Sequence, residues 1–450
     1  MDVEYSKYIK DERRTYSMYV LQSRAIPAVS DGLKASSRRV LWMARDGKLH
    51  KSAVLAGSTM PIHPHASPEG AVNTLAAFYG NNVPLLTGHG AFGTILKPTA
   101  YGASRYTSVE LSEFTKDVIF RDVEIIPMVE NYDSTLMEPK HFLPLVPIAL
   151  INPAEGIAVG FATDILPRSL EDIIMVQLMH LQGKKTLPVP MPHFVPTQNK
   201  ALEAVERRGS LSYVFQGAYD KTSASSIVVT KLPYGTLHHK FIEHLESLIE
   251  DQKGIVDYED NSRDRIKVEV KFKRGMVNKL SDAQMMKLLG LTKSTSENLT
   301  LVNFDGETIW KPDPVELITE FTDWRLQYFV ARYERLHQLV TEEIQKYLDI
   351  LLAIKMKVGL VATKTKNRVE LKEFLAEIGI VNLDYIADLP VYRFTEDERD
   401  KTQAKLEDAK GRHADYTLLL SSEAERKKVY ANELKGILKR HSNGDYDAPE

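Results

Sequence analysis

The 450-residue sequence contains no cysteine. Disulfide bonds and cysteine-ligated zinc sites are therefore excluded, and a reducing compartment such as the cytoplasm is compatible with the composition. Long apolar runs are missing too. The most apolar stretch, residues 142–161, is interrupted by three prolines and falls short of the ~20 unbroken apolar residues of a membrane helix. The N-terminus has no apolar signal core. These absences predict a cytoplasmic chain with no membrane partner.

The chain also has little net charge, −3 at pH 7, but its charges are unevenly distributed. Residues 34–106 hold eight lysines and arginines against two acidic residues, which gives this segment a net charge of +6. Positive charge gathered in one segment is typical of a face that binds phosphate groups.

The length predicts about three domains at ~150 residues each, and the pattern of the sequence indicates a multidomain α+β protein. We expect an N-terminal helical arm, a winged-helix domain, a mixed α+β domain, a long helical arm and a flexible tail, at residues 1–30, 31–150, 151–311, 312–441 and 442–450.

In residues 31–150, two short helices precede a glycine-rich segment. Helical spacing is found over Arg38–Arg45 and from Pro68 or Glu69 to Tyr79. Gly88–Gly93 matches G-x-G-x-x-G, but β-favouring residues and a proline follow it, so we expect a tight turn and no nucleotide-binding helix. Two helices followed by such a hairpin predict a winged-helix DNA-binding fold.

The later segments differ in periodicity. Ser226–Thr230 and Ile266–Val270 are predicted as strands, and Leu237–Glu250 as an amphipathic helix. Neither proline nor glycine interrupts Val315–Met356, which is long enough for a coiled-coil arm of about 60 Å. A returning helix is expected from Thr395, where Thr-Glu-Asp-Glu has capping-box spacing. The intervening residues 357–392 would form a small globular tip.

Tyr106 stands beside Arg105 at the end of the basic segment, after the loop Thr87–Gly93. A phenol oxygen is able to attack a phosphodiester and hold it as a covalent ester. A neighbouring guanidinium stabilises the charge that builds on the phosphorus oxygens. Arg38, Arg39 and a metal ion would complete the charge-neutralising shell. The alternative is that Tyr106, one of 20 tyrosines, only packs in a core or touches a phosphate.

Five motifs, in one order, resemble the DNA-cleaving subunit of type IIA DNA topoisomerases, the gyrase A family. They are Ser30–Lys34 followed by Arg38-Arg39-Val-Leu, Gly88–Thr94, Arg105–Thr107, the block Leu143–Pro147 with Asn152–Ile157, and Lys231–Tyr234. Each motif is short, but chance agreement of all five in the family's order is improbable, and together they cover nearly the whole chain.

The resemblance implies roles for particular residues. Tyr106 would be the catalytic nucleophile, assisted by Arg105 and by Arg24, which the family places beside the tyrosine of the dimer partner. The expected DNA-binding residues are Lys34, Arg38, Arg39, His63, His65 and Val146. Among these, Arg39 would bind the scissile or adjacent phosphate, and Val146 would be an apolar wedge that bends DNA. Exposed salt bridges are the alternative for Arg24 and Arg39, and core packing is the alternative for Val146.

His63-Pro64-His65 has three possible interpretations. Two histidines without cysteine make at most half a zinc site, so metal ligation is disfavoured and no metal is assigned to this chain. The resemblance instead implies histidines that line the DNA-cleavage site. A buried structural pair is the remaining alternative.

The resemblance also implies cofactors and partners. The sequence shows neither a glycine-rich ATP-binding domain nor an Asp-x-Asp metal cluster, so both Mg²⁺ and ATP are expected on a partner, an ATPase and metal-binding subunit. Double-stranded DNA and a second copy of the chain, joined through a dimer gate at the tip, would complete the assembly. The α+β segment would be the family's tower domain.

Two alternatives remain. A non-catalytic DNA-binding dimer built from helix-turn-helix and coiled coil shares the basic segment and the long helix, but it has no use for Arg105-Tyr106. A cellular gyrase or topoisomerase IV protein is the second; we expect instead the short, phage-encoded branch of the family, because no DNA-wrapping domain follows in the sequence.

Overall fold

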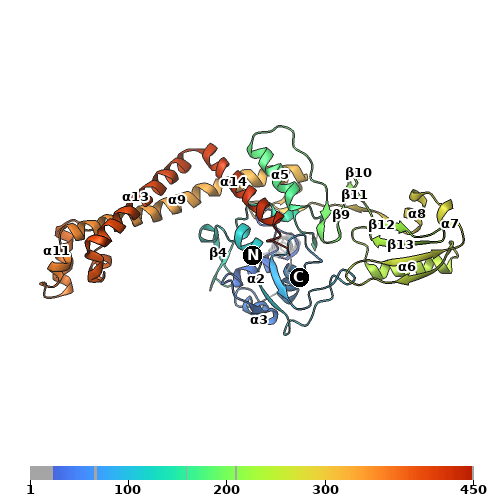
Figure 1. Cartoon of the computed structure of the whole chain (residues 1–450), viewed down its shortest axis with the longest axis horizontal. Helices are drawn as coiled ribbons and strands as arrows, with labels where there is room; N and C mark the ends of the chain where they lie inside the picture. Colours follow the sequence, from blue (N-terminus) through green and yellow to red (C-terminus); the bar gives the residue numbers. More distant parts are fainter. Residues whose placement is uncertain (1–23, 65–67, 159, 208–209, 448–450) are drawn as a thin grey trace, which may run out of the picture. The chain divides into compact units, whose positions relative to one another are not determined.

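The computed structural model describes residues 24–64, 68–158, 160–207 and 210–447. The chain forms two compact units (Figure 1). The first combines the residues up to Arg325 with those from Ala431 onward, and the second is Leu326–Tyr430. Helices and strands are mixed in the first unit, whereas the second is helical. The predicted α+β class and the long helix are therefore confirmed.

Three helices and a small antiparallel sheet form the beginning of the first unit. The helices are α2 (Ala35–Met43), α3 (Ser52–Ser58) and α4 (Pro68–Ala76). The sheet has the order β1-β3-β2, with strands β1 (His50–Lys51), β2 (Leu86–His89) and β3 (Ser108–Leu111). No helix begins in the Gly88–Gly93 loop, as the sequence predicted. Helix α3 was not predicted, because its seven small and branched residues are too few to show helical periodicity.

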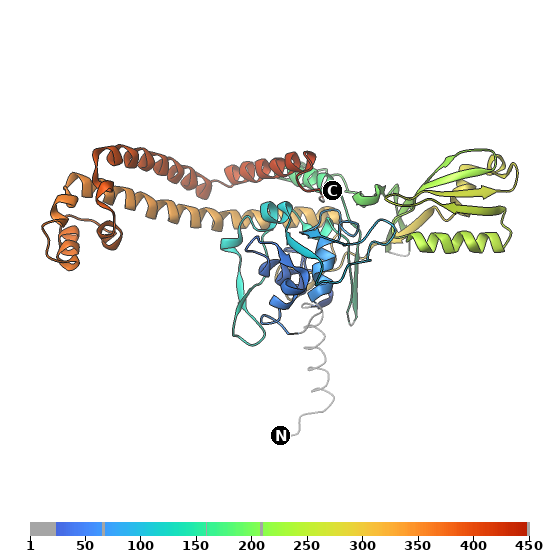
Figure 2. The same cartoon turned by 60° about the horizontal axis from the view of Figure 1, so that its bottom comes forward.

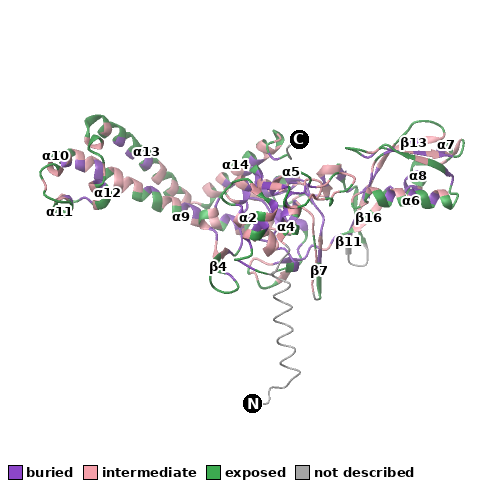
Figure 3. Cartoon of the chain, turned by 90° about the horizontal axis from the view of Figure 1, so that it is seen from below, coloured by how far each residue is buried: buried purple, intermediate pink, exposed green. Residues whose placement is uncertain are grey.

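Two exposed hairpins extend from this part of the unit, and Figure 3 shows both, at the labels β4 and β7. One pairs β4 (Met128–Glu130) with β5 (Met137–Pro139), and the other pairs β6 (Ala154–Ala158) with β7 (Phe161–Ile165). Between and around them lie the short helices η2 (Thr115–Ile119), η3 (Val123–Ile125) and η4 (Ile148–Leu150) and the longer α5 (Leu170–Leu181).

The rest of the first unit contains two further sheets. A three-stranded sheet joins β10 (Glu203–Arg207), β11 (Ser210–Gln216) and β16 (Thr292–Ser296). A four-stranded sheet has the order β12-β13-β15-β14, with bounds Ala218–Lys221, Ser226–Lys231, Val268–Phe272 and Ile255–Asp260. The remaining short elements are β8 (His193–Phe194), η5 (Val195–Thr197), β9 (Asn199–Lys200), β17 (Leu301–Val302) and β18 (Ile309–Trp310).

Helix α6 (His238–Glu250) lies along one face of the four-stranded sheet (Figure 1). Its apolar stripe of Phe241, Leu245 and Leu248 is buried there, against strand residues such as Val268 and Val270. Two short helices, α7 (Met276–Lys279) and α8 (Asp282–Leu288), contribute to the same core. The predicted strands and the predicted amphipathic helix of this region are confirmed.

The long helix α9 (Pro314–Lys355) leads into the second unit. There α13 (Glu396–Ser421) runs back beside it (Figure 2). Thr395 caps α13 by accepting a hydrogen bond from the backbone N–H of Glu398. Between these helices lie α10 (Val358–Ala362), α11 (Arg368–Glu377), α12 (Leu383–Ala387) and η6 (Val391–Phe394), which have an apolar core of their own.

The returning helix is not continuous as the sequence predicted. It breaks at Ser422, which has extended backbone, and continues as α14 (Glu423–Ser442). The residues after α14 were expected to form a flexible tail. Up to residue 447 the structure shows contacts there: Tyr446 is only 7% exposed, and its hydroxyl donates to Asp117 Oδ2 at 3.0 Å. An aromatic contact with Phe114 accompanies this bond. Within the described residues, no helix is long and apolar enough to cross a membrane.

Candidate active site

Tyr106 projects from the end of the loop that joins β2 to β3. Its side chain is 72% exposed, although most aromatic side chains are largely buried in folded proteins. The guanidinium carbon of Arg105 lies 4.8 Å from the centroid of the Tyr106 ring. An exposed phenol beside a guanidinium is able to reach a phosphodiester on a docked nucleic acid.

Hydrogen bonds on both sides of Tyr106 fix its backbone. After it, the hydroxyl of Thr107 donates to Ser52 Oγ at 2.8 Å, in a buried bond. The backbone N–H of Ser52 donates to the carbonyl of Thr107 at 3.1 Å. Gly90 and Gly102 approach the Thr107 methyl group so closely that added Cβ atoms would lie 3.3 and 3.2 Å from it. The C-terminal side of the loop is therefore anchored on the start of α3.

The N-terminal side of Tyr106 is held as well. The carbonyl of Ser104 accepts from the backbone N–H of Ala53 at 3.2 Å, and the Ser104 hydroxyl donates to Glu69 Oε1 at 2.9 Å. Glu69 lies in the first turn of α4. The Lys51 ammonium, 3.4 Å from the carbonyl oxygen of Tyr106 itself, adds a positive charge beside the tyrosine.

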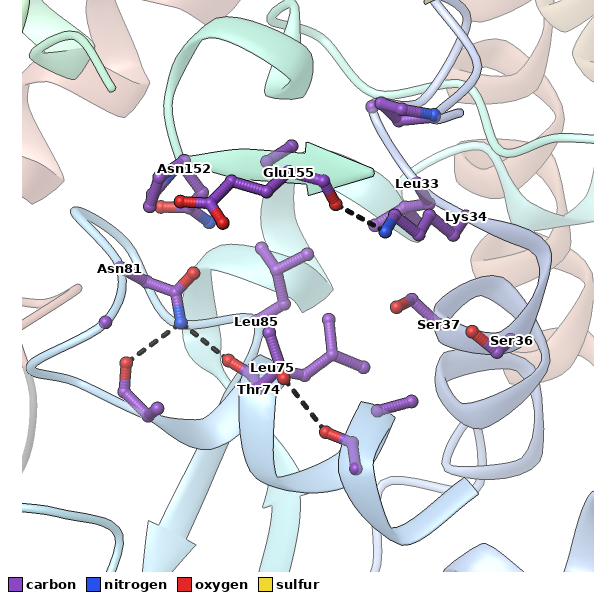
Figure 4. A pocket seen from close by; sticks show the side chains of 18 of the residues that line it. Leu33, Lys34, Ser36, Ser37, Thr74, Leu75, Asn81, Leu85, Asn152 and Glu155 are labelled. Carbon is purple, nitrogen blue, oxygen red and sulfur yellow. Dashed lines mark hydrogen bonds between the residues drawn. The ribbon is translucent and has the colours of Figure 1, made fainter. Parts of the chain in front are cut away.

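A cavity of about 790 Å³ brings together four of the predicted residues, Arg24, Lys34, Arg39 and His63. Figure 4 shows part of its wall, where Lys34 points toward Glu155 on β6. Neither Tyr106 nor Arg105 lines this cavity. The predicted residues of one chain therefore form two groups: the exposed tyrosine with its arginine, and a separate basic cavity.

Lys34 and the β6–β7 hairpin hold the cavity wall in place. The Lys34 ammonium donates to the carbonyl of Glu155 at 2.6 Å. Burial lowers the pKa of Lys34, against the opposing effect of the Glu155 carboxylate. A Cβ atom at Gly156 would lie 1.9 Å from the carbonyl oxygen of Ala25, so only glycine lets the hairpin approach this closely. Arg24, the neighbour of Ala25, is exposed.

The arginines of α2 both form bidentate ion pairs, but only one of them lines the cavity. Arg38 Nε and Nη2 lie 2.6 and 2.9 Å from the carboxylate of Asp31, whose side chain is fully buried. Arg39 Nε and Nη2 lie 2.6 and 3.0 Å from Glu138 on β5. Arg38 is therefore held against a buried carboxylate and does not line the cavity, whereas Arg39 does.

The histidine motif is only partly described. His63 is 8% exposed, and its ring lies edge-on to Tyr132, with 5.5 Å between the ring centroids. His65 lies outside the described residues. In the described part of the chain, no group of three or more histidines, aspartates or glutamates is arranged to hold a metal ion.

Val146, the residue expected to be the apolar wedge, is buried in the structure. Its side chain has 0% exposure, so in this structure it has no surface to present to DNA. Ile157, near the end of β6, is 88% exposed. The sequence motif Asn152–Ile157 includes Ile157 but gave it no role, although the glycines at 156 and 160 that flank this apolar run are a signal for a hairpin turn.

Known proteins are similar to most of this chain. The family model for the A subunit of DNA gyrase/topoisomerase IV matches residues 24–435. The DNA topoisomerase medium subunit of Enterobacteria phage T4 is 30% identical over 414 residues, which cover 87% of this chain and 90% of the phage protein.

Cellular relatives are longer than this chain. The DNA gyrase A subunit of Synechocystis sp. is 28% identical, over 95% of this chain and 54% of the relative. The DNA topoisomerase 4 A subunit of Pseudomonas aeruginosa is 27% identical, over 93% of this chain and 59% of the relative. The chain thus spans little more than half of these proteins. The family model and the phage relative together show that the chain belongs to the family of DNA gyrase and topoisomerase IV A subunits, the DNA-breakage-reunion subunits of type II DNA topoisomerases.

Proposed function

We propose that Tyr106 is the nucleophile of DNA breakage. Its phenol oxygen attacks the scissile phosphorus, the bond from phosphorus to the 3′ oxygen breaks, and the phenol proton passes to a base or water. The products are a 5′-phosphotyrosine and a free 3′-hydroxyl, and the reverse attack reseals the strand. The observation that supports this assignment is the exposed Tyr106 beside Arg105, on a loop anchored at both sides.

The two groups of site residues support assembly in trans. Tyr106 does not line the cavity that holds Arg24, Arg39 and His63, so we propose that a second copy of the chain inserts its tyrosine there. The cavity arginines would then neutralise the pentacovalent phosphorus. Arg24 and Arg39 are the cavity cations in this proposal, and Lys34 fixes the wall.

The second unit supports the dimer. Its tip exposes large apolar side chains, namely Leu360, Val369, Val381, Val391 and Tyr392, each 63–68% exposed. Exposed apolar surface of this kind is typical of an interface. We propose that the tip, residues 357–392, is the dimer gate through which the second duplex leaves.

DNA would dock on the first unit. Helices α2–α4 with the β1-β3-β2 sheet would be the winged-helix domain, and the four-stranded sheet with α6 the tower. We propose that Ile157 takes the wedge role once expected of Val146, because an exposed apolar side chain at the end of a hairpin is able to insert between base pairs.

ATP and Mg²⁺ would be supplied by an ATPase and metal-binding partner subunit, in a host cytoplasm. The described residues offer no carboxylate cluster for a metal, so the metal would be held by the partner. When bound, a divalent ion polarises the phosphate and stabilises the leaving 3′ oxygen. On this proposal the purified chain alone does not relax supercoiled DNA, with or without ATP, and the complex does.

Mixed dimers test the assembly in trans. A Tyr106→Phe chain is mixed with an Arg39→Ala chain, in the presence of Mg²⁺ and the partner subunit. In trans, the mixed dimer has one intact site and nicks one strand of a duplex, although each variant alone is inactive. In cis, both sites of the mixed dimer carry a lesion, and the mixture stays inactive.

A further inference from the structure

The β4–β5 hairpin contacts two of the proposed phosphate-site residues. On its β5 strand, Glu138 forms the bidentate pair with Arg39, at 2.6 and 3.0 Å. The two side chains are 12% and 13% exposed. They are 99 positions apart in sequence, so the hairpin, and not local backbone, brings the carboxylate to α2.

The geometry of this pair leaves part of Arg39 available. A guanidinium has five N–H donors in a planar fork. Glu138 uses the side formed by Nε and Nη2, and Nη1 makes no hydrogen bond to a described residue. The carboxylate therefore fixes the plane of the guanidinium while the end formed by Nη1 and Nη2 keeps donors for a phosphate in the cavity.

Glu138 also acts on the neighbouring arginine. Burial alone would lower the pKa of Arg38, but the carboxylates of Asp31 and Glu138 raise it above its usual value. Asp31 is fixed in turn, because it accepts hydrogen bonds from the backbone N–H groups of Leu33 and Phe142. The two arginines and two carboxylates thus form one fixed cluster beside the cavity.

The other end of the hairpin supports His63. The Tyr132 ring packs edge-on against the imidazole at 5.5 Å between centroids. The side-chain amide of Asn131 donates to the carbonyls of Pro61 and Ile62, at 3.4 and 3.3 Å. Its oxygen accepts from the backbone N–H of Thr135, which closes the hairpin turn. The segment that leads into His63 is therefore attached to the hairpin by both main chain and side chain.

We propose that the β4–β5 hairpin is a positioning element of the cleavage site, and that Glu138 is its principal positioning residue, through Arg39. This inference rests on the phosphate-binding role proposed for Arg39. Because Glu138 already neutralises part of the charge of Arg39, the pair contributes orientation to the reaction and little to DNA affinity. A misplaced charge-stabilising group lowers the rate of the chemical step even when the substrate remains bound.

Glu138→Gln tests the proposal, in the complex of full-length chain with its partner subunit. Glutamine keeps the shape of the side chain but replaces one acceptor oxygen by a donor, so the bidentate pair is lost. We expect the single-turnover rate of DNA cleavage to fall about tenfold and the DNA dissociation constant to stay within about twofold. Glu130→Gln, an exposed residue of β4 in the same hairpin, is the matched control and should leave both quantities unchanged.

A double variant of Glu138 and Arg39 distinguishes a positioning role of Glu138 from a general effect on stability. If Glu138 acts through Arg39, the double variant Arg39→Lys with Glu138→Gln loses no more rate than Arg39→Lys alone. Tyr132→Ala, a largely exposed side chain whose removal leaves the core intact, should lower the rate about threefold without changing DNA affinity.

Failure of the Glu138 proposal is distinguishable from failure of the role proposed for Arg39. If Arg39→Lys slows cleavage while Glu138→Gln has the wild-type rate, the proposal is wrong and the role of Arg39 stands. Multiplicative losses in the double variant also overturn it, because they show independent action. If Arg39→Lys itself leaves the rate unchanged, the underlying assignment of Arg39 fails first, and the proposal fails with it.

Discussion

Arg168→Met should strongly destabilise the first unit, because Arg168 is a fully buried charge with many partners. Its guanidinium forms a bidentate pair with Glu297, with Nη1 and Nη2 at 2.8 and 2.7 Å from the two carboxylate oxygens. Further bonds reach the carbonyls of Pro190 and Leu166, each at 2.9 Å. Arg168 and Glu297 are 0% and 3% exposed at the side chain. Glu297 follows β16, and the neighbouring Asn298 pairs with β7, so the pair holds the β6–β7 hairpin to the three-stranded sheet.

The size of the destabilisation follows from the unpaired, buried carboxylate of Glu297 that the substitution leaves. Methionine fills much of the volume of arginine but leaves Glu297 buried without its counter-charge. Removing one partner of a buried ion pair lowers the free energy of unfolding by about 3–5 kcal/mol. With a urea m-value of roughly 2–3 kcal/mol/M, the midpoint of unfolding should fall by about 1–2.5 M. The double variant Arg168→Met with Glu297→Leu removes both charges and should recover most of the loss.

Tryptophan fluorescence during urea unfolding is a suitable assay. All three tryptophans, Trp42, Trp310 and Trp324, lie in the first unit, so the signal reports that unit and not the helical one. Lys200→Met, which removes an exposed pair with Asp172 at 3.4 Å, is the control and should cost less than about 1 kcal/mol. If Arg168→Met lowers the free energy of unfolding as little as Lys200→Met does, the reasoning is refuted.

Three further predictions concern the site and its surroundings. Ile157→Ala should weaken DNA affinity about tenfold and reduce bending in a fluorescence-transfer assay, because the exposed wedge is shortened; an unchanged bend would exclude this residue. Glu69→Ala should slow cleavage about fivefold, while Glu69→Gln, which still accepts from Ser104, should not; equal rates would show that the bond has no part in catalysis. The hydrogen bond between His441 and Glu171 raises the pKa of His441 and lowers the pKa of Glu171 to about 2. Its stabilisation is thus complete between about pH 4.5 and 6.5, the usual values of the two groups, and is lost as pH rises through the raised pKa of His441 or falls toward 2. Melting temperatures from pH 6 to about 9 should therefore fall more steeply for the wild type than for His441→Gln; parallel curves would contradict this.

The elements with long, regular patterns were predictable from the sequence. The 42-residue helix α9 has neither proline nor glycine after its first residue, and α6 shows its apolar stripe plainly, so both were placed within one or two residues. Helix α3 was missed because seven residues give too few repeats of the helical period. The break at Ser422 was also missed, since serine does not end a helix by its residue type alone.

The sequence names candidate site residues, but it does not say which of them lie together in one chain. The resemblance placed Arg24 beside the tyrosine of the dimer partner but did not say how Arg39 lies relative to Tyr106 of its own chain. In the structure Arg24 and Arg39 line one cavity, and Tyr106 of the same chain does not line it. Val146 and Ile157 are both apolar and both close to prolines or glycines in the sequence. Only the fold reveals that one is completely buried and the other 88% exposed. Partners distant in sequence, such as Glu138 for Arg39, depend on a hairpin whose position no local pattern encodes.

The identity of the residue that becomes linked to DNA is the most direct test of the account. The complex with its partner subunit is allowed to cleave a short duplex, trapped with denaturant and digested, and the DNA-linked peptide is sequenced by mass spectrometry. We predict a 5′-phosphate ester on Tyr106 and complete loss of adduct in Tyr106→Phe, with normal adduct from Tyr258→Phe in β14 of the four-stranded sheet. A DNA-linked peptide that lacks Tyr106, or a full yield of adduct from Tyr106→Phe, would contradict the assignment.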